Sequence, residues 1–245
     1  MRVVHSACAV LIGNELLSGK VRDENLHALA STLRSVGIAL DRALVLPDQI
    51  SVLVRELKSL RSVHDLIVTS GGVGPTHDDV TLEAVAQATD APCAPNAELL
   101  GHLRAVYGVN LTTAQASMAS VPAGSRLYFG PDRIWPTIAK DEIWMLPGVP
   151  ELFRAKLATL REHLRGPDAF HTKSVFSGLD ELELKELLDQ VVASNPEVEV
   201  GSYPKWSDPS YKTRITLDGR LEANVLRALQ QLLEGLPAGE PRRVE

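Results

Sequence analysis

Short apolar runs alternate with helical patterns along the first part of the chain. The runs VVHSACAVLI, ALDRALVLPD and DLIVTSGG have the length and composition of buried strands. The segments ENLHALASTLRSVG and ISVLVRELKSLRS between them repeat apolar residues at the spacing of one helix face. Because strands that alternate with helices form parallel sheets with right-handed crossovers, the pattern predicts an α/β domain with a mostly parallel sheet.

A smaller unit is predicted after this domain. The stretch SRLYFGPDRIWPT is irregular, EIWMLPGVPELFRAKLATLREHL restores the strand–loop–helix order, and GPDAF near residue 166 is typical of a linker. Beyond the linker the pattern predicts strands near 173–177, 197–203 and 212–217 and helices over 181–193 and 221–235. We therefore divide the chain into an α/β domain over residues 1–166 and a small C-terminal α+β module over residues 167–245.

Composition and charge narrow the class of protein. Among 245 residues, 44% are hydrophobic and 23% charged, which is ordinary for a globular protein. A formal charge of −6 argues against a duplex nucleic-acid binder, because phosphate contacts need clustered Lys and Arg. No apolar run is long enough to span a bilayer, and His5 and Ser6 interrupt the first run, which favours a strand over a secretory signal. Cys8 and Cys93 suffice for neither a disulfide framework nor a metal cluster, so we expect a cytoplasmic protein without nucleic-acid or membrane partners.

Loops rich in glycine, proline, hydroxyl groups and acids follow the expected strands. GNELLSGKVRDEN follows the first strand, PDQ the second, SGGVGPTHDD the third and PGVPE the fourth. Ligands of open parallel sheets bind outside the carboxyl ends of the strands, near a switch in strand order. Because these loops all extend from those ends, we expect them to form one ligand site.

The third loop, TSGGVGPTHDDVT, combines features that favour and oppose an anion. Gly71, Gly72 and Gly74 allow a ligand to approach the main chain, and successive amides before a helix start form an anion-binding concavity. The alternative is a simple tight turn. The loop is neither a Walker loop nor a GxGxxG fingerprint.

Carboxylates stand beside this concavity. Asp78 and Asp79 have a structural explanation, since acids favour helix starts and Thr76 with Asp79 could form a variant capping box. However, Asp48 and Glu15 follow neighbouring strands, so several carboxylates are expected to converge. A divalent cation removes the conflict, because Mg²⁺ takes one or two carboxylates together with substrate phosphate oxygens. The loop therefore suits a metal–diphosphate ligand.

The motifs LIGNELLSGKVRDEN, LPDQ, TSGGVGPTHDDVTLEAV and LPGVPE resemble the molybdopterin-binding (MoaB/Mog-like) fold family. Within that family the chain is most similar to the CinA amino-terminal branch, which also supplies the front domain of eukaryotic FAD synthases. The resemblance runs from about residue 3 to 165, and VGSYPKWSDPSYKTRITLD resembles the trailing module of the same branch. It implies a three-layer α/β/α domain, a homo-oligomer (dimer or trimer), and either adenylyl transfer or, in this branch, a metal-dependent pyrophosphatase that cleaves ADP-ribose or FAD.

The resemblance also implies site residues. Asp48 and Asp79 correspond to the acids that position Mg²⁺, and Asp78 is the acid that this branch adds, so Asp48, Asp78 and Asp79 are the expected catalytic and metal-binding residues. The expected ions are a divalent metal, Mg²⁺ or Co²⁺, with K⁺ as an additional candidate. The expected ligand-binding residues come from the four loops and the trailing module: Gly13, Glu15, Ser18, Gly19, Asn25, Ser70, Gly71, Gly72, Val73, Gly74, Pro75, Thr76, Pro147, Gly148, Pro150, Tyr203, Lys212 and Arg214.

Departures from the family pattern and competing interpretations remain. Asn14 stands where an acid or Thr is common, and DRIWPTIAKDEIW is nearer the FAD-synthase version than the bacterial one. The chain ends where relatives continue into a deamidase or an adenylyltransferase, so neither of those activities is expected. His77 is expected at the surface, and the trailing-module residues fit an exposed hairpin as well as a ligand site. The alternatives to pyrophosphatase activity are molybdopterin binding or adenylylation and a non-catalytic nucleotide-binding regulatory module.

Overall fold

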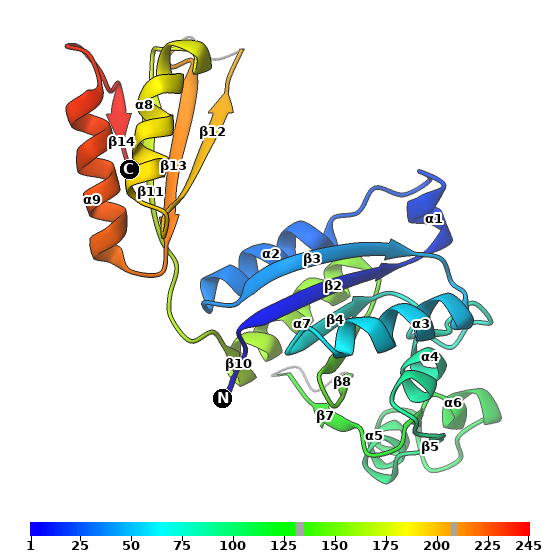
Figure 1. The fold of residues 1–245 in the computed structure, drawn as a ribbon. Coiled ribbons are helices and arrows are strands. Elements are labelled where there is room, and N and C mark those ends of the chain that lie inside the picture. Colours follow the sequence, from blue (N-terminus) through cyan, green and yellow to red (C-terminus); the bar gives the residue numbers. More distant parts are fainter. Residues whose placement is uncertain (131–134, 207–209) are drawn as a thin grey trace. The chain divides into compact units, whose positions relative to one another are not determined.

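The computed structural model describes residues 1–130, 135–206 and 210–245 (Figure 1). The chain forms two compact units, Met1–Pro167 and Asp168–Glu245, where the sequence pattern set the boundary between residues 166 and 167. Part of the irregular stretch SRLYFGPDRIWPT, residues 131–134, lies outside the described residues.

The first unit is organised around a mixed sheet of strand order β3-β2-β4-β9-β8-β7 in the described residues. Four neighbouring strands are parallel: β3 (Ala39–Leu46), β2 (Ser6–Ile12), β4 (Leu66–Ser70) and β9 (Ile143–Leu146). Strands β8 (Thr137–Lys140) and β7 (Arg126–Tyr128) follow in antiparallel order. The prediction of a mostly parallel sheet is therefore confirmed.

The antiparallel strands lie where the sequence has no regular pattern. Lys140 pairs with Ile143 across a two-residue turn, and Asp141 in this turn has a φ of +53°. Such a left-handed residue is typical of tight hairpin turns. Strand β7 has only three residues, too few to produce a recognisable alternation.

Helices cover both faces of this sheet (Figure 1). Helices α2 (Asn25–Ser35) and α7 (Pro150–His163) pack on one face, and α3 (Ile50–Arg61) and α4 (Thr81–Ala88) pack on the other. Each face carries its own hydrophobic core. Because side chains alternate along a strand, Ala7 and Ala9 of β2 pack in the core under α2 and α7, and Cys8 and Val10 pack in the core under α3 and α4. Burying each leucine of these cores contributes roughly 1.5–3 kcal/mol. The expected three-layer α/β/α architecture is confirmed.

Short elements complete the first unit. Helix α1 (Asn14–Leu17) follows β2, and β1 (Arg2–Val3) pairs with β10 (Leu164–Arg165). Beyond α4, a two-stranded sheet and two helices form a side lobe: β5 (Cys93–Pro95), β6 (Ser120–Pro122), α5 (Ala97–Tyr107) and α6 (Thr113–Ser117). Asn96 caps α5, and Thr112 with Gln115 forms a capping box at α6.

The second unit is a small α+β module, as the sequence predicts. Its elements follow the order β11 (His171–Ser177), α8 (Glu181–Ser194), β12 (Glu199–Pro204), β13 (Thr213–Gly219), α9 (Glu222–Gly235) and β14 (Arg243–Val244). The sheet order is β12-β13-β11-β14, and the two helices share a core with Val175, Ile215 and Leu217. Strand β14 was not predicted, because two exposed residues leave no apolar signal.

None of the helices in the described parts of the chain is both long and apolar enough to cross a bilayer.

Candidate functional site

A cavity of about 580 Å³ lies in the first unit beyond the carboxyl ends of the parallel strands. All four expected loops contribute to it. The predicted residues that line it are Glu15, Asn25, Asp48, Ser70, Gly71, Gly72, Val73, Gly74, Thr76, Asp78, Asp79, Pro147, Gly148 and Pro150. The carboxyl ends of parallel strands lie at one edge of the sheet, so the loops that follow them were expected to meet there. The cavity lies at this edge.

The glycine loop has a backbone that only glycine accommodates. Gly71 has a φ of +105°, and a Cβ there would lie 2.3 Å from the carbonyl oxygen of Ile12. Gly72 has a φ of +65°, and its Cβ would lie 2.4 Å from Thr81 Oγ1. Thr81 holds this turn, because its hydroxyl donates to Gly71 O at 2.8 Å and its amide to Gly72 O at 2.9 Å.

Fewer amides of the glycine loop are free to bind an anion than the sequence suggested. The Gly71 amide donates to Leu146 O at 3.1 Å, and the Gly74 amide donates to Asp79 Oδ1 at 2.7 Å. In the described part of the chain, the amides of Gly72 and Val73 have no intramolecular acceptor. These two amides, rather than the whole run from Ser70 to Gly74, are the donors available to a ligand.

Asp79 closes the loop on itself. Its Oδ2 accepts from the Thr76 amide at 2.8 Å and from the Thr76 hydroxyl at 2.5 Å, while its Oδ1 accepts from Gly74. Helix α4 begins at Thr81, with Val80 in the cap position, so Asp79 and Thr76 do not cap that helix. The prediction that Thr76 and Asp79 form a capping box at the start of α4 is therefore wrong. The contact between Thr76 and Asp79 is present, but it lies in the loop before the helix.

Asp78 lies beside the same hydroxyl and is exposed. Thr76 Oγ1 is 2.6 Å from Asp78 Oδ1, so one hydroxyl proton is shared between two carboxylates. This hydrogen bond, followed by one from the Asp78 backbone, lowers the pKa of the Asp78 carboxyl. Asp78 is therefore ionised at neutral pH.

Asp48, which follows β3, is hydrogen-bonded to the loop that follows β2. It is half-buried, and its Oδ2 accepts from the Asn14 amide at 2.8 Å. Asn14 opens helix α1, so this carboxylate lies at a helix N-terminus, where negative charge is stabilised. Glu15 folds back over Gly13, because a Cβ on Gly13 would lie 2.3 Å from Glu15 Oε1.

Asn25 links three segments of the cavity wall. The residue is 4% exposed, and its Nδ2 donates to Ser70 Oγ at 2.9 Å and to Gly148 O at 2.7 Å. Asp23 caps the start of α2 by accepting from the amides of Asn25 and Leu26 at 3.2 and 3.0 Å. Helix α2 therefore begins at Asn25, and Asp23 supplies the acceptors for its first amides.

A metal ion at these carboxylates would need further ligands. The described residues contain no group of three or more His, Cys, Asp or Glu side chains that could hold an ion by themselves. Asp48 and Asp78 both line the cavity, and Asp48 Oδ1 and Asp78 Oδ2 have no hydrogen-bond partner among the described residues. Because Mg²⁺ completes its shell with water and phosphate oxygens, this donor set suits an ion bound jointly with a phosphate ligand.

Some predicted residues lie outside the cavity lining. In the first unit these are Gly13, Ser18, Gly19 and Pro75. In the second unit, Tyr203 pairs with Arg214 across β12 and β13, Arg214 donates to Ser174 Oγ at 3.1 Å, and Lys212 lies 3.9 Å from Glu183. His77 has a side chain that is 98% exposed, as expected.

The cavity also includes residues that the sequence did not single out. Arg22 is the only basic side chain lining it in the described part of the chain, and Asp23 and Glu24 follow it. All three lie in the loop GNELLSGKVRDEN, which was predicted to contribute to the site, so they could have been predicted as lining residues from the sequence. Met118 lies at the C-terminal end of helix α6 and Trp135 in an irregular stretch, and because neither follows a predicted strand, no sequence pattern pointed to them.

Comparison with known families divides the chain at the boundary between the units. The family described as "Probable molybdopterin binding domain" matches residues 8–165. The family described as "FAD synthase, middle domain" matches residues 169–245. Each match therefore falls within one structural unit.

Similar proteins include archaeal chains and larger eukaryotic ones. A protein of Archaeoglobus fulgidus is 28% identical over 225 residues, covering 92% of this chain and 95% of that protein. A probable FAD synthase of Caenorhabditis briggsae is 30% identical over 261 residues, covering 94% of this chain and 50% of that protein. The chain thus spans about half the length of this FAD synthase.

A solved structure shares the fold. The crystal structure of CinA, a protein of unknown function from Thermoplasma acidophilum, has a TM-score of 0.58 and 28% identity to this chain. The alignment covers 64% of this chain and 96% of CinA.

Proposed function

Since the chain belongs to the family of probable molybdopterin-binding domains, we propose that it hydrolyses a dinucleotide-type diphosphate, FAD or ADP-ribose, to AMP and a second phosphate ester. The observation that carries this proposal is that Asp48, Asp78 and the free amides of the glycine loop line one cavity. The name of the FAD synthases that the chain resembles supports a ligand of the flavin dinucleotide class.

The chain's own groups suit binding and charge stabilisation. The Gly72 and Val73 amides would donate to oxygens of the diphosphate, in positions fixed by Thr81 before the ligand arrives. Arg22, which also lines the cavity, would add a positive charge. Asp79 would act by holding the loop, because its two carboxylate oxygens already accept three hydrogen bonds.

Asp48 and Asp78 would hold a divalent ion, Mg²⁺ or Co²⁺, through the oxygens that have no partner in the described residues. Such an ion, when bound, neutralises phosphate charge and lowers the pKa of a coordinated water. In the hydrolysis a water oxygen bonds to one phosphorus of the anhydride and the bond from that phosphorus to the bridging oxygen breaks. The electron pair of that bond leaves with the second phosphate.

The test is release of AMP by the purified chain. FAD and ADP-ribose are each incubated with the protein and Mg²⁺ or Co²⁺, with and without K⁺, and AMP is quantified by chromatography. Asp48→Ala and Asp79→Ala should each abolish AMP release while near-ultraviolet circular dichroism stays native-like. Full turnover in both folded variants contradicts the assignment.

The family description favours a second candidate, which is molybdopterin binding or adenylylation. A pterin that copurifies with the protein, or MgATP-dependent transfer of AMP to a pterin, would support it. A third candidate is a non-catalytic nucleotide-binding module, which predicts saturable FAD or ADP-ribose binding without AMP release.

The assembly is also a proposal. We propose a homo-oligomer, a dimer or a trimer, which light scattering on the purified chain measures directly.

A further inference from the structure

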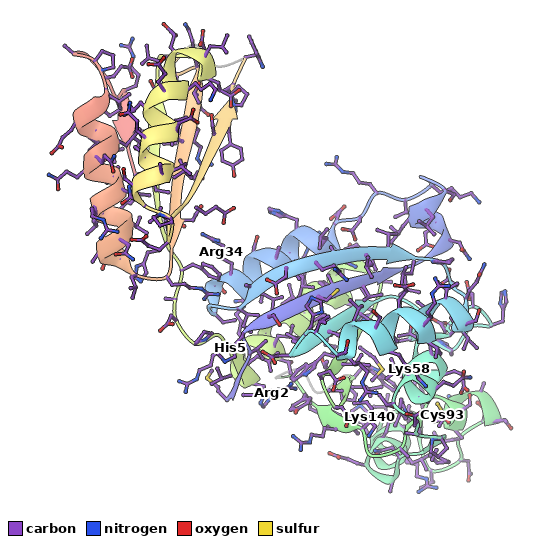
Figure 2. The ribbon with its side chains drawn as sticks, viewed as in Figure 1. Arg2, His5, Arg34, Lys58, Cys93 and Lys140 are labelled. Carbon is purple, nitrogen blue, oxygen red and sulfur yellow. The ribbon has the colours of Figure 1, made fainter. Side chains whose placement is uncertain are left out.

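A second cavity of about 620 Å³ lies in the first unit and shares no lining residue with the first cavity. Strand β1, strand β7, the β8–β9 hairpin and the end of α7 surround it. Its volume is within the range of small-molecule sites, which is about 300–1,000 Å³. Figure 2 labels Arg2 and Lys140, two of the basic side chains in this region.

The floor of this cavity is a row of side chains across three strands. Arg126 pairs with Ala139, and Ala139 pairs with Trp144, so the three residues share one face of the sheet. The Tyr128 ring stacks on Trp144 with centroids 4.5 Å apart, and the His163 ring lies 4.6 Å from Tyr128. Trp144 is only 2% exposed, so the aromatic group gives the cavity a packed, apolar base.

Positive charge remains at the rim after the internal ion pairs are considered. Asp141 is paired with Arg61 and Lys140 at 3.3 and 3.2 Å, and Glu142 is paired with Arg61. Two acids are thus matched by two bases. Arg61 and Lys140 are not among the lining residues, whereas the two arginines Arg2 and Arg126 line the cavity itself, in a chain whose formal charge is −6.

Neither of these arginines is matched by an acid in the described residues. Arg2 Nη2 donates to the neutral carbonyl of Asp65 at 2.5 Å, and the Arg126 guanidinium has no hydrogen-bond or ion-pair partner there. The Tyr128 hydroxyl and the ring nitrogens of His163 likewise have no hydrogen-bond partner in the described residues. Unused donors therefore line a cavity with an aromatic base.

We propose that this cavity is a second binding site, for a small molecule that carries an oxyanion of the phosphate or carboxylate type. A guanidinium fork matches the geometry of such an oxyanion and can donate two parallel hydrogen bonds. Arg126 and Arg2 bind the charged group, and Tyr128 and His163 contact the body of the ligand. This site is independent of the hydrolysis proposed for the first cavity.

The test measures binding to the full chain by equilibrium dialysis with inorganic phosphate, acetate, AMP and adenosine as probes. Phosphate and AMP should bind saturably, acetate tests whether a carboxylate suffices, and neutral adenosine should bind at least tenfold more weakly than AMP. Arg126→Gln should weaken phosphate binding at least tenfold. Arg104→Gln, at an exposed arginine of α5 outside both cavities, should leave it unchanged.

A variant in the first cavity distinguishes the two sites. Arg22→Gln should leave the Arg126-dependent phosphate binding intact, even if AMP release in the first cavity changes. Arg126→Lys, which keeps the charge without the fork, should give intermediate affinity and serves in place of Arg126→Gln if that variant does not fold. The proposal is overturned if no probe binds, if Arg22→Gln removes the phosphate binding, or if the Arg126 variants change only the oligomeric state.

Discussion

Asn25 of helix α2 donates a hydrogen bond to the carbonyl oxygen of Gly148, 123 residues further along the chain, at 2.7 Å. The same amide group donates to Ser70 at the end of β4. Asn25 therefore fixes the first and fourth loops of the cavity against the strand between them.

Replacing Asn25 by Ala should lower stability and loosen the cavity. The change leaves Gly148 O and Ser70 Oγ without their donor, which costs about 1–3 kcal/mol for buried polar groups. Urea unfolding measures this loss. Asn110→Ala, at an exposed residue of the side lobe, is the control and should unfold like the parent protein. Equal stabilities of the two variants would contradict a linking role for Asn25.

Gly72 and Gly19 form a matched pair for testing the glycine loop. Both have a positive φ, of +65° and +71°, so alanine at either position carries the left-handed backbone cost of about 1–2 kcal/mol. Only at Gly72 does the new Cβ meet an atom, Thr81 Oγ1 at 2.4 Å, whereas nothing lies within 4 Å at Gly19. Gly72→Ala should therefore lower the free energy of unfolding by about 1 kcal/mol more than Gly19→Ala, because the Thr81 hydrogen bond is lost as well. Chemical denaturation of both variants checks the difference, and similar losses would mean that Thr81 does not constrain the turn.

Thr76 controls the ionisation of Asp78. The Thr76 hydroxyl is the largest cause that lowers the Asp78 pKa, and His77 is the smallest. Thr76→Val should therefore raise the Asp78 pKa toward the ordinary value, and His77→Gln should raise it less. In the parent protein the lowered pKa favours folding above the unfolded-state pKa, and this contribution disappears as the pH falls through the folded-state pKa. Carboxyl chemical shifts across an acid titration give the pKa of each variant, and a larger shift in His77→Gln would contradict the assigned cause.

Both cysteines should react slowly in the native protein. Burial raises the pKa values of Cys8 and Cys93 to about 11 each, so at pH 7 about one thiol in ten thousand is ionised. Labelling with a disulfide reagent should be slow at neutral pH and should become fast in urea, where the thiol pKa returns to an ordinary value. Rapid labelling of the folded chain at pH 7 would show that one thiol is accessible and ionised.

Many lining residues of the first cavity were predictable because the carboxyl ends of parallel strands lie at the same edge of the sheet. The apolar runs identified β2, β3, β4 and β9, and the loops after them necessarily meet beyond the carboxyl ends of parallel strands. Asp48 and Asp79 were expected in one place for that reason, although they lie 31 residues apart in the sequence, and both line the cavity.

The details of hydrogen bonding were not predictable from the same pattern. The Gly71 amide is taken by Leu146 O, a contact that depends on how β4 and β9 end beside each other. Trp135 and Arg126 belong to short or irregular segments, so their places in the two cavities depend on the antiparallel hairpin that the sequence did not reveal. Local pattern indicates which segments meet, and the tertiary contacts decide which donors remain free.

Asp78 and Asp79 should respond differently to removal of their charge. An asparagine at 79 has one acceptor oxygen and an NH₂ group, so it cannot accept from Gly74, the Thr76 amide and the Thr76 hydroxyl together. Asp79→Asn should therefore speed hydrogen exchange at the Gly74 and Thr76 amides, as measured by NMR. Asp78→Asn still offers an oxygen to the Thr76 hydroxyl, so the loop should stay protected. If Asp78 holds an ion as proposed, Asp78→Asn should lose AMP release while the loop amides stay protected. Asp79→Asn should lose both AMP release and the protection of the loop amides. An Asp78→Asn variant with unchanged turnover would remove Asp78 from the proposed site and leave Asp48 without a second carboxylate for the metal.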